Sequence, residues 1–294
     1  MPLGERPMRK DRMSLMTFSM AADLACGAMR IADVLSVAGS AGIPFVDLMD
    51  IRREDLRAYR IAMEQTGIAV GCYIASASFL RAEEVWRAQL RAGFRAAAEL
   101  SARRVMIVPF SGQEDLDRAA GMGRDAVLAR MIGGFQVAVE EGRTWNVPVC
   151  FETTPHDALC LSGTADCLRV LRAVPGLGLA FDTANMLPHG DDPIEAYEAL
   201  KPHIVHVHLK DVALIGGKDA EAFWEKSRDG RGMKCVAWGE GEIPVTELYR
   251  RMLNDGYSGL FAIEYTHPEN AACGPEAHLA HLRRFFGEGP DERP

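Results

Sequence analysis

The sequence HIVHVHLKD, residues His203–Asp211, has the alternating pattern of a β-strand with one apolar and one ionisable face. Successive side chains of a strand point to opposite sides, so His206, His208 and Lys210 share one face, and the valine and leucine between them share the other. An apolar outer face and an ionisable inner face are typical of a strand in a (β/α) barrel, near the end that binds substrates. A half-exposed strand with a solvated histidine face is the alternative.

The composition is that of an ordinary globular protein, with 48% hydrophobic and 25% charged residues in 294. A net charge of −8 with no long basic run argues against nucleic acid as a partner. No apolar run reaches the length that spans a membrane, so we expect no membrane partner. Seven scattered cysteines without a C-x-x-C pair argue against a disulfide framework and predict a cytoplasmic protein.

Short apolar runs alternate with longer helical patterns through most of the chain, which predicts an α/β protein. We expect eight strands, at residues 14–20, 44–50, 68–76, 103–110, 147–152, 177–182, 203–211 and 259–265. Helices are expected at residues 29–42, 53–66, 81–100, 122–145, 164–173, 193–200, 244–255 and 274–286. Eight such units predict a single (β/α)8 TIM barrel, with a doubly wound open sheet as the alternative.

The barrel is expected to occupy residues 14–286 as one domain. Residues 1–13 are polar and basic with no apolar segment behind them, which predicts a flexible arm. Residues 287–294 are expected to be a frayed tail, and the long connection 212–243 to be a lid over the site.

Four consecutive strands each end with a group that binds metals. The fifth, sixth and eighth predicted strands end with Glu152, Asp182 and Glu264, and the seventh carries His208. Three carboxylates and an imidazole at one height would repel one another unless a divalent cation lay between them. This hard set of ligands favours Mn²⁺, with Mg²⁺, Co²⁺ or Zn²⁺ as alternatives. For each residue alone, a helix cap or a pairing with arginine is the other interpretation.

Five short motifs carry a resemblance to a known family. They are FET (residues 151–153), FDTAN (181–185), HVHLKD (206–211), GEGEIP (239–244) and AIEY (262–265). Over residues 14–286 the chain resembles the xylose isomerase-like barrel superfamily, which includes tagatose 3-epimerases, hydroxypyruvate isomerase, inosose dehydratase and endonuclease IV-like proteins. The resemblance implies that Glu152, Asp182, His208 and Glu264 hold the metal, and that the two glutamates also act as the acid/base pair.

The sequence departs from the ketose 3-epimerases at three positions that bind their substrate. Asn185 stands where they have histidine, Ala158 where they have an acidic residue, and Leu214 where they have arginine. Their substrate specificity is therefore not carried over. The H-x-H-x-K-D form is closer to the inosose dehydratase-like and glycoside-processing branches.

Five further residues are weaker candidates. Lys210 would hold a substrate oxygen or stabilise an enolate, unless it forms a structural ion pair with Asp211 or a nearby carboxylate. His156 would serve as a general acid, unless it is a solvent-exposed loop residue. The last three, Asn185, His206 and Trp238, are predicted to contact the substrate, and each has a structural alternative, given below in the same order. For these the alternatives are a loop cap, a buried histidine that supports the site and a packed aromatic.

Together these features predict a divalent-metal-dependent isomerase or epimerase. It would act on a sugar, polyol or cyclitol by removing the proton next to a carbonyl, through a metal-stabilised enediolate. A lyase or dehydratase with the same site is the alternative, since both reactions share an enolate. An endonuclease IV-like repair enzyme is disfavoured by the acidic charge and by only 8 histidines. The sequence leaves open a homo-oligomer or a partner subunit.

Overall fold

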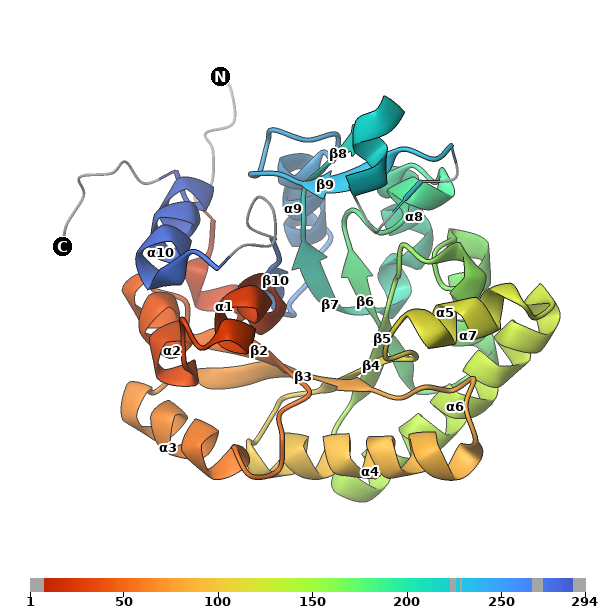
Figure 1. The fold of residues 1–294 in the computed structure, drawn as a ribbon, viewed down its shortest axis with the longest axis horizontal. Helices are drawn as coiled ribbons and strands as arrows, with labels where there is room; N and C mark the ends of the chain where they lie inside the picture. The colour runs from red at the N-terminus through yellow and green to blue at the C-terminus, as the bar shows by residue number, and fades with distance from the viewer. Residues whose placement is uncertain (1–7, 223–225, 228, 266–271, 288–294) are drawn as a thin grey trace.

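Eight parallel strands form a closed barrel, which confirms the predicted fold (Figure 1). The computed structural model describes residues 8–222, 226–227, 229–265 and 272–287. Around the barrel the strands follow the order β1-β10-β7-β6-β5-β4-β3-β2, so that the last strand pairs with the first. Their bounds are β1 (Met13–Met16), β2 (Phe45–Met49), β3 (Ala69–Ser76), β4 (Val105–Val108), β5 (Val149–Glu152), β6 (Leu177–Asp182), β7 (Ile204–Leu209) and β10 (Phe261–Ile263).

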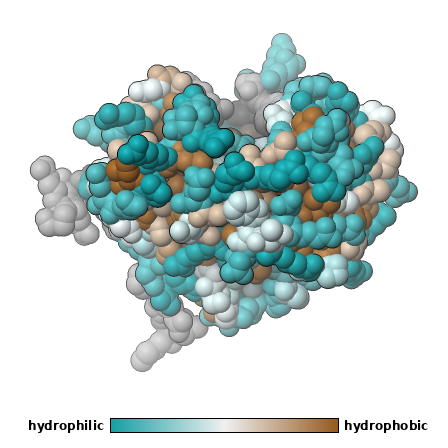
Figure 2. Space-filling model, turned by 90° about the horizontal axis from the view of Figure 1, so that it is seen from below, coloured by the Kyte–Doolittle hydropathy of each residue, from teal (hydrophilic) through white to brown (hydrophobic). Residues whose placement is uncertain are grey.

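The helices surround the strands and cover them with apolar faces. In α4 the buried side chains include Trp86, Leu90, Phe94 and Ala97, at the three- and four-residue spacing of one helix face. Figure 2 shows the face of the molecule over which α3 and α4 run, where hydrophilic side chains surround smaller hydrophobic patches. The helices are α1 (Ala21–Cys26), α2 (Ile31–Ser40), α3 (Leu56–Thr66), α4 (Glu83–Glu99), α5 (Gln113–Ala120), α6 (Arg124–Trp145), α7 (Thr164–Ala173), α8 (Pro193–Leu200), α9 (Val245–Asn254) and α10 (Gly274–Phe285).

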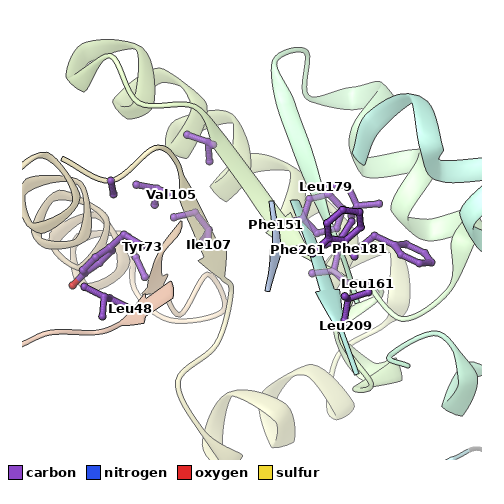
Figure 3. Close-up of a cluster of buried hydrophobic side chains, with 14 of the residues drawn as sticks. Leu48, Tyr73, Val105, Ile107, Phe151, Leu161, Leu179, Phe181, Leu209 and Phe261 are labelled. Carbon is purple, nitrogen blue, oxygen red and sulfur yellow. The ribbon is translucent and has the colours of Figure 1, made fainter. Parts of the chain in front are cut away.

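Alternation along each strand divides the apolar residues into two clusters. The larger lies between barrel and helices and includes Phe151 and Phe181 (Figure 3). The smaller cluster includes Cys150 and Ala180, which alternate with those two residues along β5 and β6. Glu152 lies two residues after Cys150, and Asp182 lies two residues after Ala180. The carboxylates at the ends of β5 and β6 therefore point to the same side of the barrel wall as these small residues.

Three local predictions were wrong. The first strand ends at Met16 instead of continuing to Met20, because residues 17–20 turn into a 3₁₀ helix that leads into α1. Helix α5 was not predicted, since only Leu116 and Ala119 among its side chains are both apolar and buried. The connection 212–243 contains an antiparallel hairpin of β8 (Val212–Ile215) and β9 (Gly232–Cys235).

The predicted N-terminal arm overlaps the packed structure. Met13 belongs to β1, and the Arg12 guanidinium donates hydrogen bonds to the carbonyl oxygens of Tyr257 and Gly259 at 2.7 and 2.6 Å. The remainder of the arm, residues 1–7, lies outside the described residues, as do residues 288–294 of the predicted tail. Among the described helices, none combines the length and the apolar character needed to cross a membrane.

Candidate metal centre

The four predicted metal ligands meet at the C-terminal end of the barrel. Glu152 is the last residue of β5, Asp182 the last of β6, and Glu264 directly follows β10. Register places Asp182 beside His208, and His208 beside Ala262 of β10. One ligand atom from each of the four side chains lies within 4.8 Å of the others. Strand pairing alone therefore assembles a set of three carboxylates and one imidazole.

His208 lies at the centre of this cluster, and its side chain is fully buried. Its Nδ1 atom is 2.8 Å from Glu152 Oε1 and 2.9 Å from Glu264 Oε2. A single hydrogen on Nδ1 cannot be donated to both carboxylates, whereas a cation in that position can be shared by them. The geometry at Nδ1 is therefore better suited to a metal than to a proton.

Unpaired polar atoms support the same interpretation. Asp182 Oδ2 and Glu264 Oε2 are buried, and neither accepts a well-formed hydrogen bond within the described part of the chain. Buried polar atoms without partners cost free energy, and most proteins satisfy them. Carboxylate oxygens and an imidazole nitrogen are the donor types that Mn²⁺, Mg²⁺, Co²⁺ and Zn²⁺ accept. The donor set therefore fits a divalent cation, whose identity the geometry leaves open.

The cluster perturbs the pKa values of its own members. Burial raises the pKa of Asp182 to about 7, and the nearby carboxylates of Glu264 and Glu152 act in the same direction. Burial also raises the pKa of Glu152. For Glu264, burial is outweighed by Lys210 and His208, and the pKa falls to about 2. Burial opposes the charged form of His208, but Glu152 and Glu264 raise its pKa well above the usual range.

Neighbouring groups fix the orientation of Asp182 and Lys210. Asp182 Oδ1 accepts hydrogen bonds from the backbone N–H groups of Ala184 and Asn185, at 2.7 and 2.9 Å, so that its other oxygen faces the cluster. The Lys210 ammonium lies 3.0 Å from Glu264 Oε1, 3.5 Å from Asn185 Oδ1 and 3.9 Å from Asp182 Oδ2. Lys210 is therefore paired with Glu264, a nearby carboxylate as the structural alternative predicted, and not with Asp211.

A cavity of about 350 Å³ opens directly at the cluster. Its polar wall includes Glu152, Asn185, Lys210 and Glu264, and His156 also lines it. The opposite wall is mainly apolar and is formed by residues that include Phe18, Met49, Met106, Val108 and Phe110. Apolar walls with a few convergent polar groups are the usual form of a small-molecule site. Lys210, His156 and Asn185 are thus brought together with the four ligand candidates.

Comparison with known proteins identifies the family. The family model described as "Xylose isomerase-like TIM barrel" matches residues 32–285 of the chain. The chain belongs to this family. The closed barrel described above is the architecture that this description names, and the four ligand candidates lie at the strand ends where barrel enzymes place their active sites.

Individual proteins that resemble this chain share less than a third of their residues with it over the matched regions. Inosose dehydratase from Bacillus thuringiensis is 27% identical over 116 residues, which are 38% of this chain and 38% of the relative. The chain therefore matches less than half the length of that relative. A solved structure of IOLI protein with a bound zinc atom has a TM-score of 0.67 at 13% identity, over 93% of this chain and 96% of that one. Escherichia coli YcjR, a 3-keto-D-glucoside 4-epimerase, has a TM-score of 0.65 at 13% identity, over 94% and 99%. At such identities the two structures are similar in fold.

Two predicted substrate contacts lie away from the cavity. The His206 side chain is fully buried, and its Nε2 atom is 2.6 Å from Asp47 Oδ2, so the residue supports the barrel interior. Trp238 packs edge-on against Phe285 with ring centroids 4.4 Å apart, and its indole nitrogen donates to Thr246 Oγ1. Neither side chain lines the cavity, so the structure does not bring them together with the other site candidates there, and substrate binding by them stays a prediction.

Asp47 is a buried acidic partner of His206 that the sequence did not lead us to expect. Its Oδ1 atom accepts hydrogen bonds from Ser14 Oγ at 2.6 Å and from the Cys72 backbone N–H at 2.9 Å. Burial would raise the pKa of Asp47, but His206, His208 and the hydrogen bond from Ser14 lower it overall. An acidic residue inside the apolar run Phe45–Met49 was the signal available in the sequence.

The predicted lid is anchored by Asp211. Its carboxylate accepts hydrogen bonds from the backbone N–H groups of Gly239, Gly241 and Ile243, at 2.8, 3.1 and 3.2 Å. These residues end the connection that begins with the β8–β9 hairpin, so Asp211 holds the two ends of the connection together. No described residue of 212–243 lines the cavity at the metal ligands, and the proposed lid function stays a prediction.

Proposed function

We propose that the protein is a divalent-metal-dependent enzyme that removes the proton next to the carbonyl of a keto sugar or cyclitol and returns it as an isomerase or epimerase. The carrying observation is the set of three carboxylates and an imidazole within 4.8 Å at the end of a cavity. When bound, the cation supplies Lewis acidity toward the substrate oxygens and makes the neighbouring C–H bond more acidic. Mn²⁺ is our first candidate, because oxygen ligands dominate the set.

The protein's own residues would hold the substrate and move the proton. Glu152 and Glu264 differ in environment, since burial raises the pKa of Glu152 whereas Lys210 and His208 bring that of Glu264 to about 2. Carboxyl groups with separated pKa values are suited to act as an acid/base pair. Glu152 is the more accessible, with a side chain 16% exposed against 4% for Glu264, and is our candidate for the group that exchanges its proton.

Lys210 and Asn185 would bind the substrate oxygens. The ammonium of Lys210 is buried at the cavity wall, and a fixed positive charge there stabilises the negative oxygen of an enolate. Asn185 is held by a hydrogen bond from its Nδ2 to the carbonyl oxygen of Thr153 at 2.8 Å, which leaves its Oδ1 toward Lys210. A hydroxyl group of the substrate would bind between these two side chains.

Dehydration is the second candidate outcome, and His156 is the observation that favours it. This side chain lines the same cavity, on the loop after β5, and its ring packs edge-on against Phe110 with centroids 5.2 Å apart. A histidine in this position would protonate a departing hydroxyl group after the enolate has formed. Inosose dehydratase, the relative described above, is named for a reaction of this kind.

Hydrogen exchange distinguishes the outcomes. The protein would be incubated with Mn²⁺ and a panel of keto sugars and inososes in deuterated water, and followed by nuclear magnetic resonance. Isomerisation or epimerisation places deuterium on the carbon skeleton without loss of water, whereas dehydration yields an unsaturated product. If no member of the panel exchanges a carbon-bound proton when metal is saturating, the proposal is wrong for these substrate classes.

Matched variants identify the site. Glu264→Gln removes a carboxylate from the cluster, and we expect exchange to slow by about 10²–10⁴-fold, the usual contribution of a general acid or base. Glu247→Gln alters an exposed glutamate of α9 in the same way and should leave the rate unchanged. Equal rates in the two variants would contradict the assignment.

A further inference from the structure

A second group of metal-binding side chains lies outside the barrel mouth. Helices α1 and α10 come from opposite ends of the chain and lie side by side (Figure 1), where Asp23 of α1 contacts Cys273 and His278 at the start of α10. One ligand atom from each of these three residues lies within 4.8 Å of the other two. The side chains of Asp23 and His278 are 2% and 0% exposed and Cys273 is half-buried, so two of the three candidate ligands are enclosed by protein.

The distances in this group match those between ligands of one metal ion. His278 Nε2 is 3.0 Å from Asp23 Oδ2 and 3.4 Å from Cys273 Sγ. In a tetrahedral zinc site, bond lengths of about 2.0–2.3 Å place neighbouring ligand atoms roughly 3.3–3.6 Å apart. The observed pairs therefore differ from the zinc geometry by only a few tenths of an ångström. A single hydrogen on Nε2 would serve only one of the two neighbours well.

The other polar atoms of these side chains already have partners. Asp23 Oδ1 accepts hydrogen bonds from the backbone N–H groups of Cys273 and Gly274, at 3.0 and 2.7 Å. His278 Nδ1 is 2.8 Å from the hydroxyl oxygen of Tyr265, to which an Nδ1–H group would donate. Metal-binding histidines commonly hold their second nitrogen in this way, which orients the ring and fixes its tautomer. The atoms directed at one another are thus the ones that would coordinate the ion.

We propose that Asp23, Cys273 and His278 form a second metal site, which takes Zn²⁺ and ties α10 to α1. A carboxylate and a thiolate neutralise the charge of one divalent ion, which favours enclosure in a buried position. A thiolate with an imidazole is a softer ligand set than three carboxylates with an imidazole, so Zn²⁺ is preferred here over Mn²⁺ or Mg²⁺. Three protein ligands leave one position of the tetrahedron for a further ligand.

Cobalt spectroscopy tests this site separately from the one at the barrel mouth. Co²⁺ bound to a thiolate gives an intense near-ultraviolet charge-transfer band, and the cluster around His208 contains no sulfur ligand. Titration of the metal-free, reduced protein with Co²⁺ should therefore produce this band, and added Zn²⁺ should remove it. Absence of the band at saturating Co²⁺ would show that the group is a hydrogen-bonded contact between helices and would overturn the proposal.

Variants assign the band to its ligands. Cys273→Ser keeps the size of the side chain and should abolish the band, and His278→Gln should also remove it. Cys26→Ser changes an exposed thiol on the same helix as Asp23 and should retain the full band. Glu264→Gln should retain it as well, because that residue belongs to the other site. Persistence of the band in Cys273→Ser, with circular dichroism showing a folded protein, would refute the assignment.

Discussion

The two histidines of β7 are two residues apart on the same strand, yet the structure gives them opposite environments. The rings of His206 and His208 lie edge-on with centroids 5.4 Å apart, and both are fully buried. His206 has one carboxylate partner, Asp47, which is itself held by Ser14 and Cys72. His208 faces two carboxylates with one nitrogen, and the second nitrogen of each ring has no hydrogen-bond partner among the described residues.

The difference shows how depth in the barrel determines what a histidine does. Burial lowers the pKa of His206 in spite of Asp47, which is consistent with a neutral ring that donates Nε2–H to the carboxylate. The carboxylates around His208 raise its pKa well above the usual range, against the effect of burial. His206 therefore faces a single carboxylate as a neutral ring, whereas His208 belongs to a set of charges that a cation would balance.

The largest expected effect is on His208. In His208→Gln the barrel-mouth site loses its only nitrogen ligand, and we expect the exchange reaction to slow by about a thousandfold, because the bound ion contributes several kcal/mol to the transition state. Electron paramagnetic resonance of added Mn²⁺ would measure the accompanying loss of binding. His203→Gln is the matched control, because His203 ends the 3₁₀ helix directly before β7 and lies outside the cluster. Undiminished Mn²⁺ binding in His208→Gln would break the comparison.

A smaller effect is expected at His206, and on stability instead of catalysis. His206→Leu leaves Asp47 as a buried charge without its partner, and we expect the free energy of unfolding to fall by about 3 kcal/mol. Urea denaturation followed by circular dichroism would measure it. Adding Asp47→Asn to this variant should recover part of the loss, because no unpaired charge remains. If His206→Leu instead abolished Mn²⁺ binding in a folded protein, the two histidines would not differ as described.

The smallest effect is the pH dependence of metal binding, which sharpens the comparison without a mutation. A cation must displace the protons held by His208, whose pKa is raised well above its usual range, and by Asp182, whose pKa is about 7. As the pH is lowered, the affinity for Mn²⁺ should therefore fall by about tenfold per pH unit just above pH 7, where only His208 is protonated. Below pH 7 it should fall more steeply, because both groups are then protonated. Isothermal titration between pH 6 and 8 would measure the slope, and a flat profile would contradict these assignments.

The sequence was sufficient for the barrel because each unit repeats one pattern. Apolar runs such as Leu177–Asp182 have the length of a strand, and helices such as α4 have a clear apolar face. Helix α5 escaped prediction because its buried polar residue, Asp115, is stabilised by Arg81 at 2.6 Å, a contact 34 residues away in the chain. The β8–β9 hairpin escaped because it lies outside the repeating pattern altogether.

The candidate site was predictable to the extent that it depends on strand ends. Glu152, Asp182 and Glu264 come together because parallel strands place their C-terminal ends at one level, which strand positions in the sequence already imply. The partnership of His206 with Asp47 joins residues 159 apart, and only closure of the barrel brings β2 and β7 within reach. The packing of Trp238 against Phe285 was not predictable, because the sequence of a turn does not indicate the side on which an aromatic residue packs.

Asp211 fixes one part of the connection after β7, the turn around Gly239–Ile243, and leaves the part between the two hairpin strands replaceable. A side chain at Gly241 would place its Cβ only 2.1 Å from Asp211 Oδ1 and 2.6 Å from the carbonyl oxygen of Val212, so the turn that Asp211 holds tolerates little change. Among the described residues between the two hairpin strands, none donates a hydrogen bond to the carboxylate of Asp211, the immediate neighbour of Lys210. Relatives could therefore exchange that insert for others of different length and chemistry while the ammonium stays in register with Glu264.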